Sequence, residues 1–433
     1  TLIVLPILYF LFEKGIKGRR KKDLHVPVLL LVFFGFSMNL KAQNPTLTLP
    51  EVLELAYKNN QILQANTFEV QSAEQLRRAS GILPKTNFNA NLGQNNSRRF
   101  DENLSVSQDI PNPVLLRARR NLSDQNILAL QQNFNISKQE LTFNIRQSWY
   151  QIQYLQALKK VLAQEDSLLQ QFVKVASLKF KTGESNLLEK TTAETRQQNL
   201  LQNIQQVKVL IETEKLKLGQ WINPEVFSVP EMPFSPLPFS EILDSSLLKN
   251  NPLLLFAQQQ IALAEAEKRV VKAEALPDFT AGYFIQSLAG AQEVDGQIRN
   301  YNATPRFQGV QLGISFPIFG AKGYRAKSGA AAIQVLAHQK QSDYLQTQLQ
   351  SQLRQHAGQF FFWKNNVAYY QNTALPNAKS IVSNASKAYQ NGDIGYLEYA
   401  TALQTNLEIQ RAYLEAINSL NQTVIAIQFI INQ

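Results

Sequence analysis

The sequence has 433 residues, of which 44% are hydrophobic and 18% are charged, a composition typical of an ordered protein. It has no cysteine and only three widely spaced histidines, which excludes disulfides, a cysteine nucleophile and a lipid-modified N-terminal cysteine, and argues against a metal cluster. The net charge is +10, but half of this excess lies in residues 1–43, where seven basic residues accompany two acidic ones. The remaining basic residues are interleaved with acids, so we expect no nucleic-acid partner. Because cysteine is absent and histidine is scarce, we also expect no metal, and we expect no cofactor.

The N-terminal region contains two apolar segments separated by a basic stretch. Thr1–Phe12 is followed by KGIKGRRKK, and a second apolar run covers residues 26–38. This second run is too short to span a bilayer comfortably, but it suits the hydrophobic part of a secretory signal. Its basic flank predicts export of everything after Ala42, although Leu40 stands where a small residue is preferred near a cleavage site. We interpret residues 1–42 as a hydrophobic and basic leader, with a buried core helix as the alternative.

The rest of the chain is organised as two similar halves. Segments containing LELAYKNNQ and DSSLLKNNP are followed by leucine-proline steps at Leu83-Pro84 and Leu276-Pro277. A second pair of similar segments, residues 176–193 and 385–402, occurs in the same order. We therefore predict a tandem duplication with repeats at 43–237 and 238–433. The second pair of segments aligns Gly183 with Gly392, Leu188 with Leu397, and Glu189 with Glu398.

Each half is predicted to begin with a helix and to continue with two strands. The helices, at about 49–82 and 239–275, should end near the leucine-proline steps because proline disfavours helical geometry in the preceding residue. Period-two alternation then predicts strands with one polar and one apolar face, a pattern that suits a transmembrane barrel. For any one strand, a soluble hairpin packed on a helix is the alternative. The alternating residues lie in segments 86–92, 104–107, 278–285 and 310–316.

Two long helical arms follow the strands. Residues 114–224 contain no proline before Pro224, and the only expected break is the turn at 182–186. The first arm, about 114–180, would be roughly 100 Å long. The matching arm at about 320–390 should be kinked at Pro376. Helices this long must pack along their length, and a soluble coiled coil is the simplest alternative to a membrane channel.

Duplicated strand pairs that join very long helices in one exported chain resemble the TolC family of outer-membrane efflux factors. The resemblance covers about residues 47–433. It is carried by an aromatic residue, a glycine and a hydrophobic-acid pair in each half, and by the SFPIFG run at residues 315–320 with SQDIP at 107–111. Thr1–Phe12 separately resembles the end of the last transmembrane helix of a heavy-metal pump of the resistance-nodulation-division family.

The resemblance implies a mainly α fold with a transmembrane β part. Three chains would form a twelve-stranded β-barrel in the outer membrane, continued by an α-helical barrel in the periplasm. The partners would be two further copies, a periplasmic adaptor protein, an inner-membrane resistance-nodulation-division pump and outer-membrane lipid. The periplasmic tip would dock the adaptor through Gly183, Gly392, Phe180 and Tyr389.

The resemblance also suggests an acidic gate at this tip. Glu398, and less closely Glu189, match the family's acidic position, but Thr401 and Thr192 replace the second acid expected three residues later. An acid on a solvated helix surface is an equal alternative for Glu398.

We weigh three functions. The first is a passive exit duct for small molecules or metal cations, with a type I protein-secretion duct as its nearest variant. An enzyme is disfavoured because no nucleophile elbow, phosphate loop or metal-spaced histidine pair occurs. The third is a periplasmic coiled-coil adaptor or scaffold without a pore.

Overall fold

A computed structural model describes residues 47–94, 99–222, 229–239, 245–302, 304 and 307–432. The chain divides into two units, Thr1–Thr46 and Leu47–Gln433. The predicted leader at residues 1–42 lies outside the described residues. The described residues all belong to the second unit.

Each half begins with a helix that is interrupted at an asparagine. The first half has α3 and α4 on either side of Asn60, whose side-chain oxygen accepts hydrogen bonds from the backbone N–H groups of the second and third residues of α4. Asn251 caps α7 in the same way. The prediction of uninterrupted helices at 49–82 and 239–275 is therefore wrong, because these caps begin a new helix inside each segment. The bounds are α3 Leu49–Asn59, α4 Gln61–Ala79, the 3₁₀ helix η1 Ser245–Asn250 and α7 Pro252–Ala273.

The predicted strands form one antiparallel sheet of four strands, in the order β1-β2-β3-β6. A separate hairpin, β4–β5, extends the connection between β3 and β6 and was not predicted. Its turn is formed by Asp295 and Gly296, both with positive φ, which is the backbone conformation that Asp-Gly favours in a tight hairpin. The bounds are β1 Asn87–Gly93, β2 Asp101–Ile110, β3 Asp278–Gln286, β4 Gly290–Val294, β5 Gln297–Tyr301 and β6 Phe307–Ser315.

The long helical arms are present as predicted. The first arm is a single helix, α5, of 69 residues, followed by a turn and α6. In the second arm a π-helical turn, Tyr370–Ala374, ends two residues before Pro376, which lacks the N–H that a regular helix needs at that point. The kink expected at Pro376 is thus a widened turn. The bounds are α5 Pro113–Lys181, α6 Leu187–Ile222, α8 Ala321–Tyr369, α9 Leu375–Asn391 and α10 Tyr396–Ile431.

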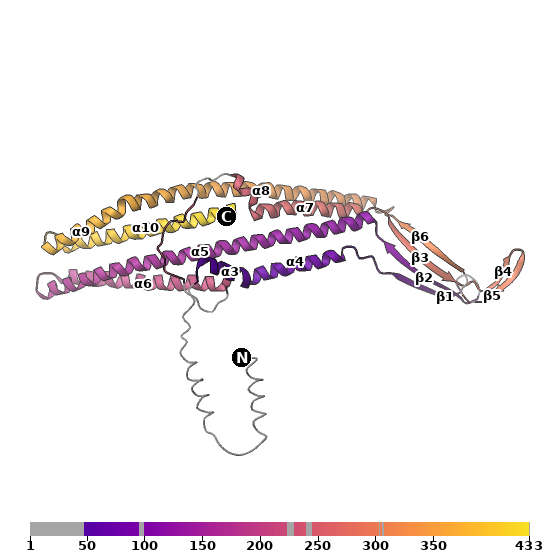
Figure 1. Cartoon of the computed structure of the whole chain (residues 1–433), viewed down its shortest axis with the longest axis horizontal. Helices are drawn as coiled ribbons and strands as arrows, with labels where there is room; N and C mark the ends of the chain where they lie inside the picture. The colour runs from indigo at the N-terminus through magenta and orange to yellow at the C-terminus, as the bar shows by residue number, and fades with distance from the viewer. Residues whose placement is uncertain are drawn as a thin grey trace, which may run out of the picture. The chain divides into compact units, whose positions relative to one another are not determined.

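The helices next to the sheet follow the order of the strands. Helix α5 packs on α4 and on α7, and α7 packs on α8, so the layer α4-α5-α7-α8 continues the order β1-β2-β3-β6. Further from the sheet the neighbours change, and α5 packs against α6 and α10, with α9 beside α10. Figure 1 shows the sheet at one end of the Leu47–Gln433 unit and the α5–α6 and α9–α10 turns at the other.

An apolar row along α5 holds the part remote from the sheet together. Its buried positions recur at steps of three or four residues, close to the spacing of a coiled-coil seam. They pack with a similar row on α6 that includes Leu200, Ile204, Val207 and Ile211. Among the described helices only α10 is long and apolar enough to cross a membrane, and most of it is buried, as expected for a core helix. The α5 row contains Ile152, Leu155, Leu158, Leu162, Glu165, Leu169, Phe172 and Ala176.

The middle of the seam between α5 and α10 is polar instead, between aromatic contacts of Phe143 with Phe429 at one end and of Phe172 with Tyr396 at the other. Asn418 donates to Gln151, Gln422 donates to the backbone oxygen of Gln147, and Arg146 donates to Gln428. Several amide oxygens in or beside this seam are buried and accept no hydrogen bond from the described residues. Because buried polar groups normally have partners, this seam is a place where water is expected. These oxygens belong to Gln139, Gln156, Asn418 and Gln422.

Candidate functional site

The register of the sheet separates an apolar face from a polar face. Directly paired residues share a face, so Phe88, Val106, Tyr283 and Val310 form one apolar row across all four strands. Phe88 is 70% exposed and Val310 is 72% exposed, so this face has no partner among the described residues. The next row on the opposite face consists of Asn87, Ser107, Gly282 and Gln311.

Phe284 interrupts the polar face. Its ring covers Gly309 on the neighbouring strand, where a Cβ atom would lie 2.7 Å from the ring carbons. Because Gly309 has no side chain, the Phe284 ring can occupy this space. The less regular alternation of the third strand, visible in the sequence, corresponds to this aromatic ring on the polar face.

Both edges of the sheet are open within the described chain. Strand β1 pairs only with β2, and β6 pairs only with β3. An open edge exposes unpaired backbone N–H and C=O groups, which are costly in lipid unless another strand pairs with them. The helices that continue these edges, α4 and α8, also carry exposed apolar side chains. They include Ile62, Phe68 and Leu76 on α4 and Ile333, Leu336 and Tyr344 on α8.

The two glycine turns at the opposite end have the same backbone geometry. Gly183 has φ +81° and Gly392 has φ +82°, a region that side chains other than glycine rarely adopt. Each glycine N–H donates to the carbonyl three residues earlier, and the next residue donates to the carbonyl five residues earlier. This is the Schellman motif, so the repeat seen in the sequence is a repeat of helix C-caps.

The two turns differ in their aromatic side chains. Phe180 is 37% exposed, whereas Tyr389 is buried and its ring stacks on Tyr399 at 5.0 Å between centroids. Phe172 of α5 stacks on Tyr396 at 4.9 Å and also contacts both other tyrosines. The structure thus brings Tyr389 into an aromatic cluster and leaves Phe180 outside it. The sequence reasoning missed this cluster, although the aromatic spacing Tyr396–Tyr399 is visible.

The two candidate gate acids occupy equivalent positions in the first turns of α6 and α10. The Glu398 side chain accepts a hydrogen bond of 2.6 Å from the backbone N–H of Gly395. Glu189 accepts one of 2.8 Å from the Ser185 hydroxyl, and its backbone N–H donates to Asn186. Both acids therefore help to begin their helices, a role that sequence spacing alone did not reveal.

Burial raises the pKa of Tyr389 to about 12, with a further contribution from the negative charge of Glu189. Burial also raises the pKa of Tyr396, partly offset by Arg196. Both hydroxyls are buried without a hydrogen-bond partner among the described residues. Arg196 donates to the backbone oxygen of Ala400, which links α6 to α10. Glu189 thus lies close to the aromatic cluster, while Glu398 is exposed.

The described residues hold no group of three or more histidine, cysteine, aspartate or glutamate side chains placed to bind a metal ion. The candidate functional features of the described residues are therefore the sheet, with its apolar face, polar face and open edges, and the two matching helix turns.

Comparisons with known proteins agree with this geometry. Residues 243–433 match the family model described as outer membrane efflux protein. No curated protein sequence matches the chain. Among solved structures, the outer-membrane channel OprN superposes with a TM-score of 0.74 at 16% identity, covering 88% of this chain and 89% of its own.

Two further structures have similar folds. The outer membrane protein VceC of Vibrio cholerae gives a TM-score of 0.73 at 14% identity, with 88% of this chain and 95% of VceC covered. CusC, whose structures are described in terms of folding and transmembrane channel formation, gives a TM-score of 0.71 at 18% identity, with 92% of this chain and 95% of CusC covered. At these identities the likeness establishes the fold. Residues 243–433 are thus similar to the outer membrane efflux protein family, and the described chain has the fold of solved outer-membrane channels.

Proposed function

We propose that three copies of this chain close a twelve-stranded barrel in the outer membrane and form the exit duct of a tripartite efflux system. The observation that carries the proposal is the four-stranded sheet with one apolar face, one polar face and two unpaired edges. Pairing β1 of one copy with β6 of the next would satisfy both edges and turn the apolar face to lipid. The polar rows would then line a water-filled lumen.

The helical part would continue this lumen into the periplasm. Its tip, with Gly183, Gly392, Phe180 and Tyr389, is the proposed docking site for a periplasmic adaptor protein, which would connect the duct to an inner-membrane resistance-nodulation-division pump. Leu188 and Leu397 support this assignment, because they occupy matching positions beside the turns and are 74% and 68% exposed. Exposed leucines of this kind are suited to a protein partner.

Glu398 and Glu189 are the proposed gate acids at the same end. Acidic groups at a constriction favour cations, so the duct would pass small molecules or metal cations that the pump delivers. The chain itself would do no chemistry, and opening of the tip would depend on the adaptor and the pump.

The proposal is tested by extracting residues 43–433 from outer membranes in detergent and inserting the purified protein into planar bilayers. We expect a heat-modifiable trimer that conducts ions, seen in electron micrographs as a hollow three-fold cylinder more than about 100 Å long. A soluble monomer or dimer, or a trimer without conductance, would contradict the channel and favour a periplasmic scaffold.

A further inference from the structure

An apolar groove with a basic rim lies between α5 and α7, where these helices join the sheet. The groove has a volume of about 670 Å³. Val114, Ala118, Ala273 and Leu276 supply its apolar floor, and the polar residues around them are Arg117, Asn121, Arg269 and Lys272. The residues from each helix are spaced three or four apart, so each helix contributes one continuous face.

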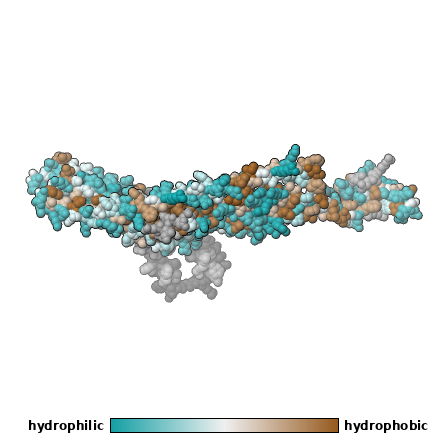
Figure 2. Space-filling model, turned by 90° about the horizontal axis from the view of Figure 1, so that it is seen from above, coloured by the Kyte–Doolittle hydropathy of each residue, from teal (hydrophilic) through white to brown (hydrophobic). Residues whose placement is uncertain are grey.

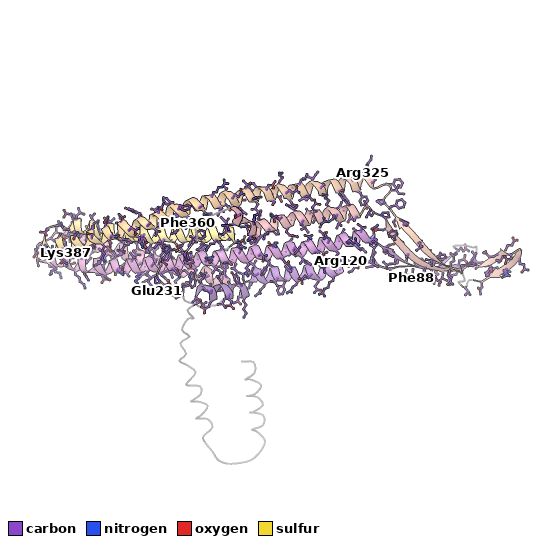
Figure 3. The ribbon with its side chains drawn as sticks, turned by 45° about the horizontal axis from the view of Figure 1, so that its top comes forward. Phe88, Arg120, Glu231, Arg325, Phe360 and Lys387 are labelled. Atoms are coloured by element: carbon purple, nitrogen blue, oxygen red, sulfur yellow. The ribbon has the colours of Figure 1, made fainter. Side chains whose placement is uncertain are left out.

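A second groove of about 440 Å³ lies at the same level between α7 and α8. Its floor includes Phe316, Pro317 and Tyr324, and its cations are Arg325 and Lys272. Lys272 lines both grooves, so they are neighbours on the same side of α7. Figure 3 places Arg325 where α8 meets the sheet, with Arg120 at the same end of α5.

The grooves open on the apolar side of the sheet. Phe316 directly follows β6 and continues the two-residue spacing of Val310, Leu312 and Ile314, all of which are exposed on the apolar face. Hydrophobic surface gathers over the ends of the helices next to the sheet (Figure 2). Assembly through the sheet edges would not cover the α5–α7 groove, because both helices are internal to the layer.

Three of the four cations around the grooves are available to a ligand, and the fourth, Arg269, donates a hydrogen bond to Asn121. Arg77, close by on α4, is paired with Asp124, but no carboxylate in the described chain forms a salt bridge with Arg117, Lys272 or Arg325. All three side chains are exposed. Unpaired cations around an apolar floor are complementary to a molecule that carries a negative head and a hydrocarbon chain.

We propose that these two grooves bind an anionic phospholipid of the membrane leaflet that faces the helices. Lys272, with Arg117 on one side and Arg325 on the other, holds the lipid phosphate, and an acyl chain lies on the apolar floor toward the sheet. This inference rests on the proposed insertion of the sheet in a membrane. The bound lipid would fix the depth at which the barrel ends and the helices begin.

The test measures lipid retained by the detergent-purified full chain, using native mass spectrometry after addition of phosphatidylglycerol or of phosphatidylcholine with the same acyl chains. We expect the wild type to retain phosphatidylglycerol preferentially. The triple variant Arg117→Gln, Lys272→Gln, Arg325→Gln should retain it about tenfold less, because each cation near an anionic headgroup adds to the attraction. The matched control Lys160→Gln, Lys174→Gln, Lys208→Gln removes the same charge from exposed positions remote from the grooves and should behave as wild type.

Two further arms separate the possible ligands. Leu276→Asn removes part of the floor without changing charge and should also lower retention, whereas millimolar inorganic phosphate should not displace the lipid. Equal retention by the triple variant and its control, no preference over phosphatidylcholine, or displacement by phosphate would overturn the proposal. The same samples report trimer formation and conductance. A wild-type trimer that conducts but shows no lipid preference would reject only the lipid site. A wild-type protein that forms no conducting trimer would reject the channel itself.

Discussion

Glu165 occupies a position that its neighbours along the α5 seam fill mainly with apolar side chains. It is 5% exposed, and burial raises its pKa to about 7 from an ordinary value of 4.5. A carboxyl with a raised pKa stabilises the fold fully below the unfolded value and loses that contribution as the pH rises through about 7. The helix seam should therefore be weakened in mildly alkaline conditions.

Glu165→Gln tests this consequence, because it keeps the shape of the protonated acid without its titration. We expect the variant to be more stable than wild type by about 2 kcal/mol near pH 9 and nearly equal to it near pH 4. Thermal unfolding in detergent at the two pH values measures the difference. Glu54→Gln, at an exposed position of α3, should change stability little at either pH. A pH-independent effect of Glu165→Gln would show that its carboxyl does not titrate in the seam.

Glu398 allows charge and helix capping to be separated at the tip. Glutamine can still accept the hydrogen bond from the Gly395 N–H, so Glu398→Gln removes the charge while keeping the cap. We expect the preference of single channels for cations over anions to fall roughly twofold. Glu212→Gln, on an exposed stretch of α6, should leave the preference unchanged. If Glu398→Gln also leaves ion selectivity and block by multivalent cations unchanged, the residue is only a helix cap.

At the scale of elements, Asn60 and Asn251 occupy equivalent positions in the sequence repeat but hold different amounts of the fold together. Both cap a helix, but Asn251 is fully buried and its amide also donates to the backbone oxygen of Ile430 at 2.7 Å. Asn60 is partly exposed. The second cap therefore also ties the start of α7 to the end of α10.

We expect Asn60→Ala to cost about 1 kcal/mol, the usual value of a helix cap. Asn251→Ala should cost about 2–3 kcal/mol, because it also leaves the Ile430 carbonyl buried without its partner. Thermal unfolding of the two variants in parallel measures the difference. Equal losses would mean that the contact with Ile430 contributes nothing beyond the cap.

These elements also show which parts of the fold the sequence predicts. Alternation of polar and apolar residues predicts the four strands, and the proline-free run predicts α5, because both signals are local. The helix breaks were missed because an asparagine cap competes with a continuing helix, and the pattern of apolar residues does not show which one prevails. The β4–β5 hairpin was missed although Asp295-Gly296 is a strong turn signal.

At the tip, the turns at Gly183 and Gly392 were predicted from local sequence, and the structure has turns there with both glycines at positive φ. The burial of Tyr389, the exposure of Phe180 and the clustering of Phe172 with α10 depend on how helices distant in sequence pack. A repeat predicts equivalent backbones, but it does not predict equivalent surroundings.

At the scale of the whole molecule, assembly through the sheet edges can be tested with introduced cysteines, because the chain has none. Asn89 and Gln311 lie on the polar face, on β1 and β6, and both are exposed. We expect Asn89→Cys, Gln311→Cys protein treated with a bis-maleimide to give covalent dimers and trimers on denaturing gels, and nothing larger, because a closed ring has three contacts.

The control pair is Asn89→Cys, Ser105→Cys, which are register partners on neighbouring strands of the same copy. Its cross-links should remain within one chain and give only monomers. Monomers alone from the β1–β6 pair, or a ladder that continues beyond three, would contradict the closed trimer.

The two seams of α5 have different mechanical properties. Against α6, side chains interlock in an apolar row, so sliding one helix along the other would open voids. Against α10, amides meet amides, with buried oxygens left over that can exchange one donor for the next. Shear along this polar stretch therefore meets a lower barrier than shear along the α5–α6 row, and the ring contacts of Phe143 and Phe172 with α10 limit it at either end. When a force acts on the part remote from the sheet, the helices should move as two stiff pairs, α5 with α6 and α9 with α10, that slide past each other along the polar stretch.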